Sequence, residues 1–231
     1  SGAFLLAFNE KTPYLFTLVD HFNDENSVIV RYSGMTDQAN IIKEYRISTI
    51  DYKIDLAITI EPLMQNVELQ PRIFIPVPFI PVVDVEKVAG IVYNSRGSLE
   101  EIKLQDNFNT VWASPNIFGV QGRYFMNALI SDKNSFVQRA YFKSQGKNLV
   151  TAILEGPVVQ EKTTWNLSFY CGPKEPVSLV AVDKRLEGAM GYGWFAPIAK
   201  LMMYLLNWAH TYVKSYGWAI ILLTIVMRLL M

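Results

Sequence analysis

Only a few side chains of this sequence have the type and spacing that acid–base chemistry requires. Two carboxylate pairs, Asp51/Asp55 and Glu100/Glu101, lie in strand-like segments, and two carboxylates flanking a glycosidic bond can hydrolyse it. His21 lies in a polar segment, and a histidine acting with a carboxylate can catalyse sugar epimerisation. The alternation places Asp51 and Asp55 opposite the apolar row, so we interpret them as solvent-facing and His21 as part of a loop. We therefore expect no catalytic residue.

Metal ligands are equally scarce. The chain has one cysteine, Cys171, and two histidines, His21 and His210. One cysteine excludes a disulfide framework and a multi-cysteine metal site. Cys171 precedes a Gly-Pro pair, and we interpret it as structural. We expect neither a metal site nor a cofactor.

Arg228 is the most unusual charged residue. Thirteen residues without a charge, Ser215–Met227, precede it. If a membrane span begins near Gly217, Arg228 lies about 16 Å deeper at 1.5 Å per residue, near the middle of a hydrocarbon core about 30 Å thick. An arginine at that depth costs at least about 2.5–3.5 kcal/mol and usually faces a polar cavity or a partner. The alternative is an arginine that snorkels to the far interface.

The residues before this segment predict a helix over 194–214. At 100° per residue its polar side chains fall on one narrow stripe, and apolar side chains cover most of the remaining surface. Such a helix lies in a membrane interface, or under other helices of a larger core. We expect the following residues to contact the interface or to couple the helix to it: Trp194, Phe195, Lys200, Leu201, Leu205, Trp208, Tyr212 and Trp218.

Residues 1–185 predict β-structure. The segment Tyr52–Ile60 alternates apolar and mostly polar residues, which is typical of a strand with one buried face. About ten such segments, without helical patterns between them, predict an antiparallel sandwich or barrel. The apolar segment Pro71–Pro81 holds four of the 11 prolines, and proline lacks the N–H that a central strand donates. We therefore expect a loop or an edge segment there. The other predicted strands are Ser27–Tyr32, Ile41–Thr49, Ala89–Tyr93, Leu99–Leu104, Tyr124–Ile130, Phe136–Phe142, Leu149–Leu154 and Trp165–Phe169.

Composition separates these two parts. The chain has 231 residues, of which 51% are apolar, and equal numbers of basic and acidic side chains, 21 each. Only four of these 42 lie after residue 185. A balanced, apolar chain excludes intrinsic disorder and makes a nucleic-acid binder improbable. We expect a β domain over residues 1–187, a glycine-containing hinge over 188–193, an amphipathic helix over 194–214 and the start of a truncated transmembrane helix over 215–231.

Three sequence runs resemble one family. They are Gly193-Trp-Phe-Ala-Pro-Ile-Ala-Lys-Leu201, Leu205-Leu-Asn-Trp-Ala-His-Thr-Tyr212 and Tyr216-Gly-Trp-Ala-Ile-Ile-Leu-Leu-Thr-Ile-Val-Met-Arg228. They are similar to the Gly-Trp entry, the interfacial helix with Leu-x-Trp-x-His and the span with Thr-x-x-x-Arg of the YidC family of bacterial membrane protein insertases (the YidC/Oxa/Alb group).

This resemblance implies a fold and a function. The fold is an antiparallel β super-sandwich in the periplasm, followed by an interfacial helix and a span of the bacterial inner membrane. The function is assistance to nascent membrane proteins during insertion and folding, alone or with the Sec translocon, without enzymatic chemistry. By the same resemblance Arg228 lies in the hydrophilic substrate groove. The implied partners are nascent membrane proteins, the Sec translocon and the lipid bilayer.

Two other hypotheses remain open from sequence. One is a membrane-anchored β-sandwich domain that binds or processes carbohydrate, and a cluster of His, Asp and Glu in an open cleft would favour it. The other is a scaffold whose β domain only docks partners, and an apolar or charged edge strand without cleft chemistry would favour it.

Overall fold

The structure is a computed structural model that describes residues 4–8, 14, 16–64, 68–78, 88–93, 97–103, 110–144, 150–190 and 196–230. The chain forms two compact units, Ser1–Ala189 and Met190–Met231. The first unit holds the described strands and the second holds two long helices.

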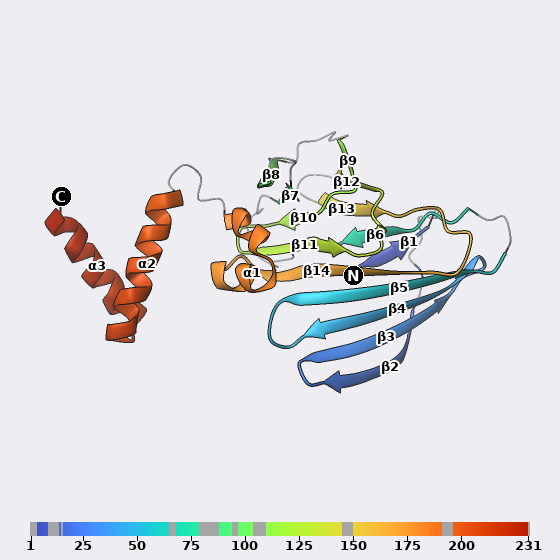
Figure 1. The fold of residues 1–231 in the computed structure, drawn as a ribbon, viewed down its shortest axis with the longest axis horizontal. Coiled ribbons are helices and arrows are strands. Elements are labelled where there is room, and N and C mark those ends of the chain that lie inside the picture. Colours follow the sequence, from blue (N-terminus) through green and yellow to red (C-terminus); the bar gives the residue numbers. More distant parts are fainter. Residues whose placement is uncertain are drawn as a thin grey trace. The chain divides into compact units, whose positions relative to one another are not determined.

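A nine-stranded antiparallel sheet is the larger layer of the first unit (Figure 1). Strand β14 is central, so the strand that leads toward the helices has neighbours on both sides. In spatial order the strands are β2 (Thr17–Asp24), β3 (Ser27–Met35), β4 (Ala39–Ser48), β5 (Lys53–Pro62), β14 (Thr163–Pro173), β11 (Phe125–Asp132), β10 (Phe118–Gln121), β7 (Ala89–Tyr93) and β8 (Leu99–Lys103).

A five-stranded antiparallel sheet packs against it, and the apolar core lies between the two. Its strands in spatial order are β1 (Leu5–Ala7), β6 (Arg72–Ile75), β13 (Val150–Glu155), β12 (Arg139–Ser144) and β9 (Val111–Ala113). The predicted antiparallel sandwich followed by C-terminal helices is thereby confirmed.

Alternation along the strands builds this core. On β5, Leu56, Ile58 and Ile60 are buried, and each lies opposite an apolar or aromatic residue of at least one neighbouring strand, β4 or β14. Ile58, for example, is paired with the buried Trp165 of β14. Because side chains alternate between the two faces of a strand, the intervening polar residues of β5 point away from the second sheet.

Two interpretations of segments were wrong. Residues Arg72–Ile75 of the proline-rich segment form β6, which is bonded on both sides, to β1 and to β13. Pro71 and Pro76 flank these four residues, so the strand keeps every N–H that its ladder needs. Positions 79–81 of that segment lie outside the described residues. The polar segment around His21 is strand β2, at the edge of the large sheet, where charged side chains reach water.

Among the described residues, two charged side chains are buried, Glu155 and Lys43. The Glu155 side chain on β13 is only 1% exposed and forms ion pairs with Arg72 (2.9 Å) and Arg139 (2.6 Å). Lys43 on β4 points its ammonium at the carbonyl oxygen of Phe4 and at the ring of Phe16. Glu155 therefore links three neighbouring strands of the smaller sheet, and Lys43 ties residues near the N-terminus to the large sheet.

Two short helical segments follow β14 and were not predicted. Helix α1 (Pro176–Val182) and the 3-10 helix η1 (Lys184–Met190) each contribute a fully buried leucine, Leu179 and Leu186. Helix α1 packs against β14, whose Tyr170 is also fully buried. Pro176 at the start of α1 is a signal that sequence reasoning could have used, because proline favours the first helical turn.

The second unit is a pair of helices, α2 (Ala196–Val213) and α3 (Tyr216–Leu230). Both were predicted, with bounds that differ by one or two residues. Lys214 and Ser215 join them.

Candidate functional site

The α2–α3 hairpin contains the described part of the predicted site. Helix α2 ends at Val213, and the next residue, Lys214, has a positive φ of 52° and donates its backbone N–H to the carbonyl oxygen of His210 (2.8 Å). Helix α3 starts after Ser215, whose carbonyl oxygen accepts the N–H of Ala219 (3.1 Å). The left-handed residue reverses the chain so that the two helices lie side by side.

Small residues and one ring pair form the contact between the helices. Ala209 of α2 and Ala219 of α3 are both buried, which lets the two backbones approach closely. The His210 ring stacks on the Tyr216 ring, with centroids 3.9 Å apart and planes 16° apart. The predicted polar stripe is therefore correct in part only, because His210 faces the neighbouring helix.

The outer surface of this hairpin is apolar. On α2, Trp208 and Tyr212 are exposed and touch each other through rings 5.0 Å apart. So wide an exposed apolar surface on a helical pair marks a site for lipid or for further helices. The exposed apolar residues are Ile198, Leu201, Met203, Tyr204, Trp208 and Tyr212 on α2, and Tyr216, Trp218, Ile220, Ile221, Leu222, Ile225 and Val226 on α3.

The predicted interface residues have different positions on this hairpin. Leu201 and Trp208 are exposed, and Leu205 is half-buried toward the helix contact. Tyr212 and Trp218 are exposed as well. Trp194 and Phe195 lie outside the described residues, and for Lys200 only the backbone, within α2, is described.

Arg228 lies in the last turn of α3 and is exposed. Thr224 precedes it by one turn on the same face and donates its hydroxyl to the carbonyl oxygen of Ile220 (2.7 Å). No ion pair joins Arg228 to another residue in the described part of the chain. The groove role of Arg228 stays a prediction.

Within the residues that the structure describes, none of the helices has the length and apolarity needed to cross a membrane.

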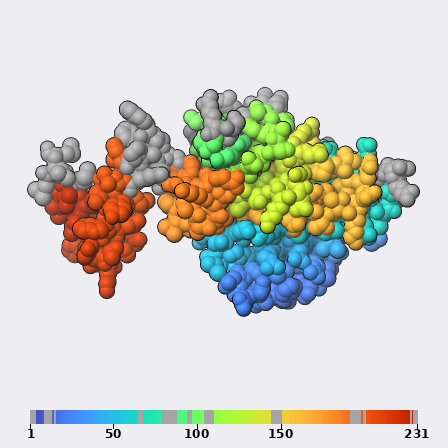
Figure 2. Space-filling view, in the orientation of Figure 1, coloured from blue at the N-terminus to red at the C-terminus, as the bar shows by residue number. Residues whose placement is uncertain are grey.

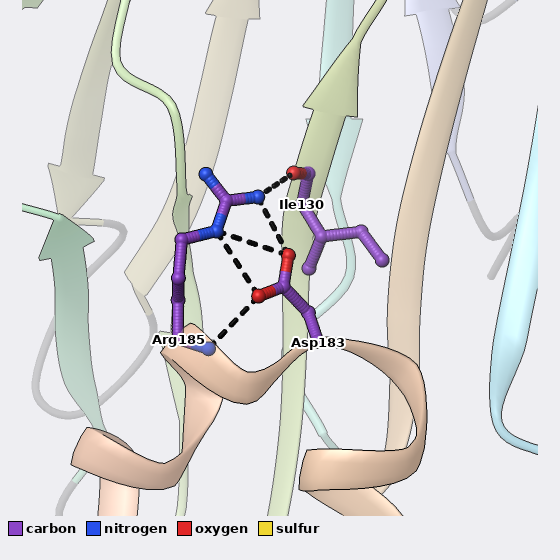
Figure 3. A network of polar contacts seen from close by, with 3 residues as sticks. All are labelled: Ile130, Asp183 and Arg185. Atoms are coloured by element: carbon purple, nitrogen blue, oxygen red, sulfur yellow. Dashed lines mark hydrogen bonds and ion pairs between the residues drawn. The ribbon is translucent and has the colours of Figure 1, made fainter.

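An arginine fixes the segment that follows α1 to the β domain (Figure 3). Arg185 of η1 forms an ion pair with Asp183 (2.6 Å) and donates from Nη2 to the carbonyl oxygen of Ile130 on β11 (2.9 Å). Its guanidinium also lies 5.7 Å from the centre of the Tyr93 ring on β7. Burial alone raises the pKa of Asp183, but the hydrogen bonds and charge of Arg185 outweigh it, and the pKa is lowered. The Asp183–Arg185 pair is therefore charged and holds η1 against two strands.

A polar hollow lies on the free face of the large sheet but lacks the chemistry of an epimerase. It has a volume of about 360 Å³ and is lined by four carboxylates, Asp24, Glu25, Asp51 and Asp55, together with Arg46 and Lys53 among others. His21 is not among its lining residues. Two of the carboxylates form ion pairs, Asp24 with Arg46 and Asp55 with Lys53, which is typical of a solvated sheet face.

Other reactive groups in the described residues are poorly placed for catalysis. Burial raises the pKa of the Cys171 thiol to about 12, so it is protonated at neutral pH and a weak nucleophile. The described residues contain no group of three or more His, Cys, Asp or Glu side chains that could hold a metal ion.

The fold and the helices define a class of two-part proteins, an antiparallel β-sandwich domain followed by a helical hairpin with exposed apolar faces. Comparison with known proteins gives the family. The model of the YidC periplasmic domain matches residues 9–205. The chain therefore belongs to the YidC family.

Individual relatives agree with this assignment. The membrane protein insertase YidC of Syntrophobacter fumaroxidans is 30% identical over 211 residues, which cover 84% of this chain and 37% of that protein. The membrane protein insertase YidC of Campylobacter jejuni is 45% identical over 62 residues, 27% of this chain and 12% of that protein. The chain thus spans a little over one third of the first relative's length.

Solved structures give only a loose likeness. A galactose mutarotase-like protein from Clostridium acetobutylicum has a TM-score of 0.42 and 9% identity, covering 68% of this chain and 66% of that chain. A putative aldose 1-epimerase from Escherichia coli K12 has a TM-score of 0.40 and 8% identity, covering 68% of each chain. Likeness at this level defines neither a function nor a substrate.

Proposed function

We propose that this chain is the β domain of a membrane protein insertase together with the membrane-associated helices that follow this domain. The observation that carries the proposal is the match of the YidC periplasmic domain to residues 9–205, which runs from the β domain into α2. The exposed apolar surface of α2 and α3 supports it, because such a surface needs lipid or further helices as cover.

The proposal assigns a place to each part. Residues 1–187 lie in the periplasm, 188–193 form the hinge, 194–214 lie in the membrane interface, and 215–231 begin a span of the bacterial inner membrane. The exposed Trp208, Tyr212 and Trp218 suit an aromatic belt at the interface. The partners are the lipid bilayer, nascent membrane proteins and the Sec translocon.

The proposed mechanism makes and breaks no covalent bond. A nascent apolar segment is held briefly beside Arg228, whose charge offers a partner to polar or acidic groups of the segment. The segment then partitions into lipid, driven by the transfer of its own apolar surface. Thr224 lies one turn before Arg228 and shares its face, so it lines the same path.

The test is site-directed photocrosslinking in the full-length parent protein, with a stalled nascent membrane protein as bait. A photoreactive residue replaces, one at a time, Arg228 itself, Thr224, which lies about 40° from Arg228 around the helix, or Val226, which lies about 160° from it. Crosslinks to the nascent chain from position 224 and from position 228, with lipid crosslinks from position 226, support the proposal. Equal crosslinking from all three positions, or none to the nascent chain, overturns the role of Arg228.

A further inference from the structure

Exposed apolar side chains gather at one end of the β domain. Six of them form what we term the exit rim: Ile50, Tyr52, Tyr124, Phe125, Val177 and Val180. They come from three segments, namely the β4–β5 turn with Tyr52, the β10–β11 turn with Phe125, and helix α1. These segments lie at the same end of the large sheet (Figure 1).

Backbone contacts place these segments around the end of β14. Phe125 is paired with Pro173, and the Cys171 N–H donates to the carbonyl oxygen of Tyr52 (2.9 Å). The Lys174 N–H donates to the carbonyl oxygen of Tyr124 (2.6 Å). Figure 2 shows the orange atoms of α1 and η1 bordering the cyan atoms of the β4–β5 region. The rim is therefore a single surface rather than scattered side chains.

The composition of the rim matches that of a bilayer interface. Two tyrosines and a phenylalanine lie at turn tips, and aliphatic side chains lie beside them. Rings with a polar edge favour the headgroup level of a bilayer. The exposed Arg123 holds its guanidinium 5.4 Å from the centre of the Tyr124 ring, and Lys174 is half-buried. Long cationic side chains that cover apolar surface with their stems are favoured at a membrane interface.

The course of the chain indicates which partner the rim meets. The chain leaves the β domain at this end, through α1 and η1, and six residues after Met190 it begins α2 with its exposed apolar side chains. A surface tethered so closely to a membrane helix meets lipid at a high effective concentration, so even weak apolar contacts suffice. We propose that the exit rim docks on the lipid bilayer interface. This inference rests on the proposed function, because α2 must itself lie at the membrane.

The other end of the same sheet provides an internal control. Met35, Leu63 and Met64 are exposed there, but they are not aromatic, and the chain does not leave the domain at that end. Ten residues of β5 separate the two ends, a distance of about 33 Å along an extended strand. Docking of the exit rim therefore leaves Met35 in water.

The test measures the depth of single labels on the complete 231-residue chain in phosphatidylcholine vesicles. In a Cys171→Ala background, an environment-sensitive dye is attached after Val177→Cys, Met35→Cys or Leu201→Cys. The wild-type side chains at the first two positions are equally open, 77% and 79% exposed. At each labelled position, quenching of the dye fluorescence by spin-labelled lipids is compared with quenching by aqueous iodide.

The expected result is lipid quenching at positions 177 and 201 and iodide quenching at position 35. Adding Ile50→Glu and Tyr124→Glu to the position-177 chain should shift the docking equilibrium toward water about tenfold or more, because two apolar side chains become charged. Met35→Glu is the matched change that should leave position 177 quenched by lipid.

Other results overturn the inference in distinguishable ways. Iodide quenching at both 177 and 35, with lipid quenching at 201, rejects the docked rim and leaves the proposed function intact. Iodide quenching at all three positions rejects both the docked rim and the proposed function. Protection of position 177 from both quenchers indicates a protein contact instead of lipid and also rejects the inference.

Discussion

The ammonium of Lys43 donates a hydrogen bond of 2.9 Å to the backbone carbonyl oxygen of Phe4 inside the sandwich. Lys43 is only 3% exposed, and its ammonium also lies over the face of the Phe16 ring, 4.3 Å from the ring centroid. No described carboxylate forms an ion pair with Lys43. Burial therefore lowers the pKa of Lys43 to about 8.

This pKa predicts a pH dependence of stability. Below pH 8 the folded state carries a buried charge that the unfolded state, with a pKa of 10.5, solvates freely. The buried charge lowers the free energy of unfolding by about 3 kcal/mol, and this loss disappears as the pH rises from 8 to 10.5. The free energy of unfolding of the wild type should therefore rise relative to that of Lys43→Met over this interval, as denaturant titrations at several pH values would measure.

Other groups that titrate in that range affect the free energy of unfolding of the wild type and of Lys43→Met equally, so their effects cancel in the difference between the two chains. Burial, with a contribution from Tyr32, raises the pKa of Tyr45 to about 12, so both chains lose stability above pH 10 for that separate reason. If the difference in the free energy of unfolding between the two chains stayed constant from pH 7 to 10.5, the conclusion that Lys43 is buried and charged would be contradicted.

Glu155 should be a major determinant of stability. Replacement by Gln keeps the size but removes the charge that holds Arg72 and Arg139 against the smaller sheet. We expect a loss of about 3 kcal/mol, as is typical when one partner of a buried ion pair is removed. The exposed pair of Glu61 with Lys162 (3.2 Å) is the control, and Glu61→Gln should cost less than about 1 kcal/mol. If urea unfolding gave equal losses of unfolding free energy for Glu155→Gln and Glu61→Gln, burial would not set the strength of these ion pairs.

Arg185 should control the opening of η1. Arg185→Ala removes charge-assisted hydrogen bonds to Asp183 and to the carbonyl oxygen of Ile130. Amide hydrogen exchange over residues 184–190 should become about tenfold faster or more, since each such bond contributes about 1.5–3 kcal/mol. Lys184→Ala, at an exposed neighbouring position, should leave the exchange rates unchanged. Equal acceleration in both variants would contradict the role of Arg185.

Gly119 should not tolerate a side chain. A Cβ there would meet the carbonyl oxygen of Asn127 and lie 2.5 Å from the Cα of Ala128, both backbone atoms of the neighbouring strand. Gly119→Ala should therefore cost at least about 2 kcal/mol of folding free energy. Gly217→Ala, whose nearest neighbour would be Ser215 Oγ at 3.8 Å, should leave the unfolding of the β domain unchanged. Thermal unfolding followed by near-ultraviolet circular dichroism measures both.

The sequence predicted strands best where one face is buried. The alternation over Tyr52–Ile60 identified β5, because burial of one face of this strand against the smaller sheet leaves a period of two in the residue types. It missed β2, whose eight residues are all exposed, because an edge strand without a buried face carries no such period. It missed β6 because proline was taken as a property of the whole segment, whereas only the four residues between Pro71 and Pro76 enter the ladder.

The candidate site was predictable in composition but not in geometry. The apolar faces of α2 and α3 follow from the helical period. The His210–Tyr216 stack depends on how the two helices pack, which no single-helix pattern contains. The exit rim unites a turn and a helix that are more than 100 residues apart in sequence, and only the sheet order brings Tyr52 and Val177 to one end.

The central position of β14 has a mechanical consequence. The chain continues from β14 through α1 and η1 toward the helices, so a pull from that direction loads β14 along its own axis. The ladders to β5 and β11 flank the strand and run nearly perpendicular to such a force. Many hydrogen bonds would therefore have to break together in shear rather than one at a time, and the β domain should resist tension transmitted through its C-terminal end.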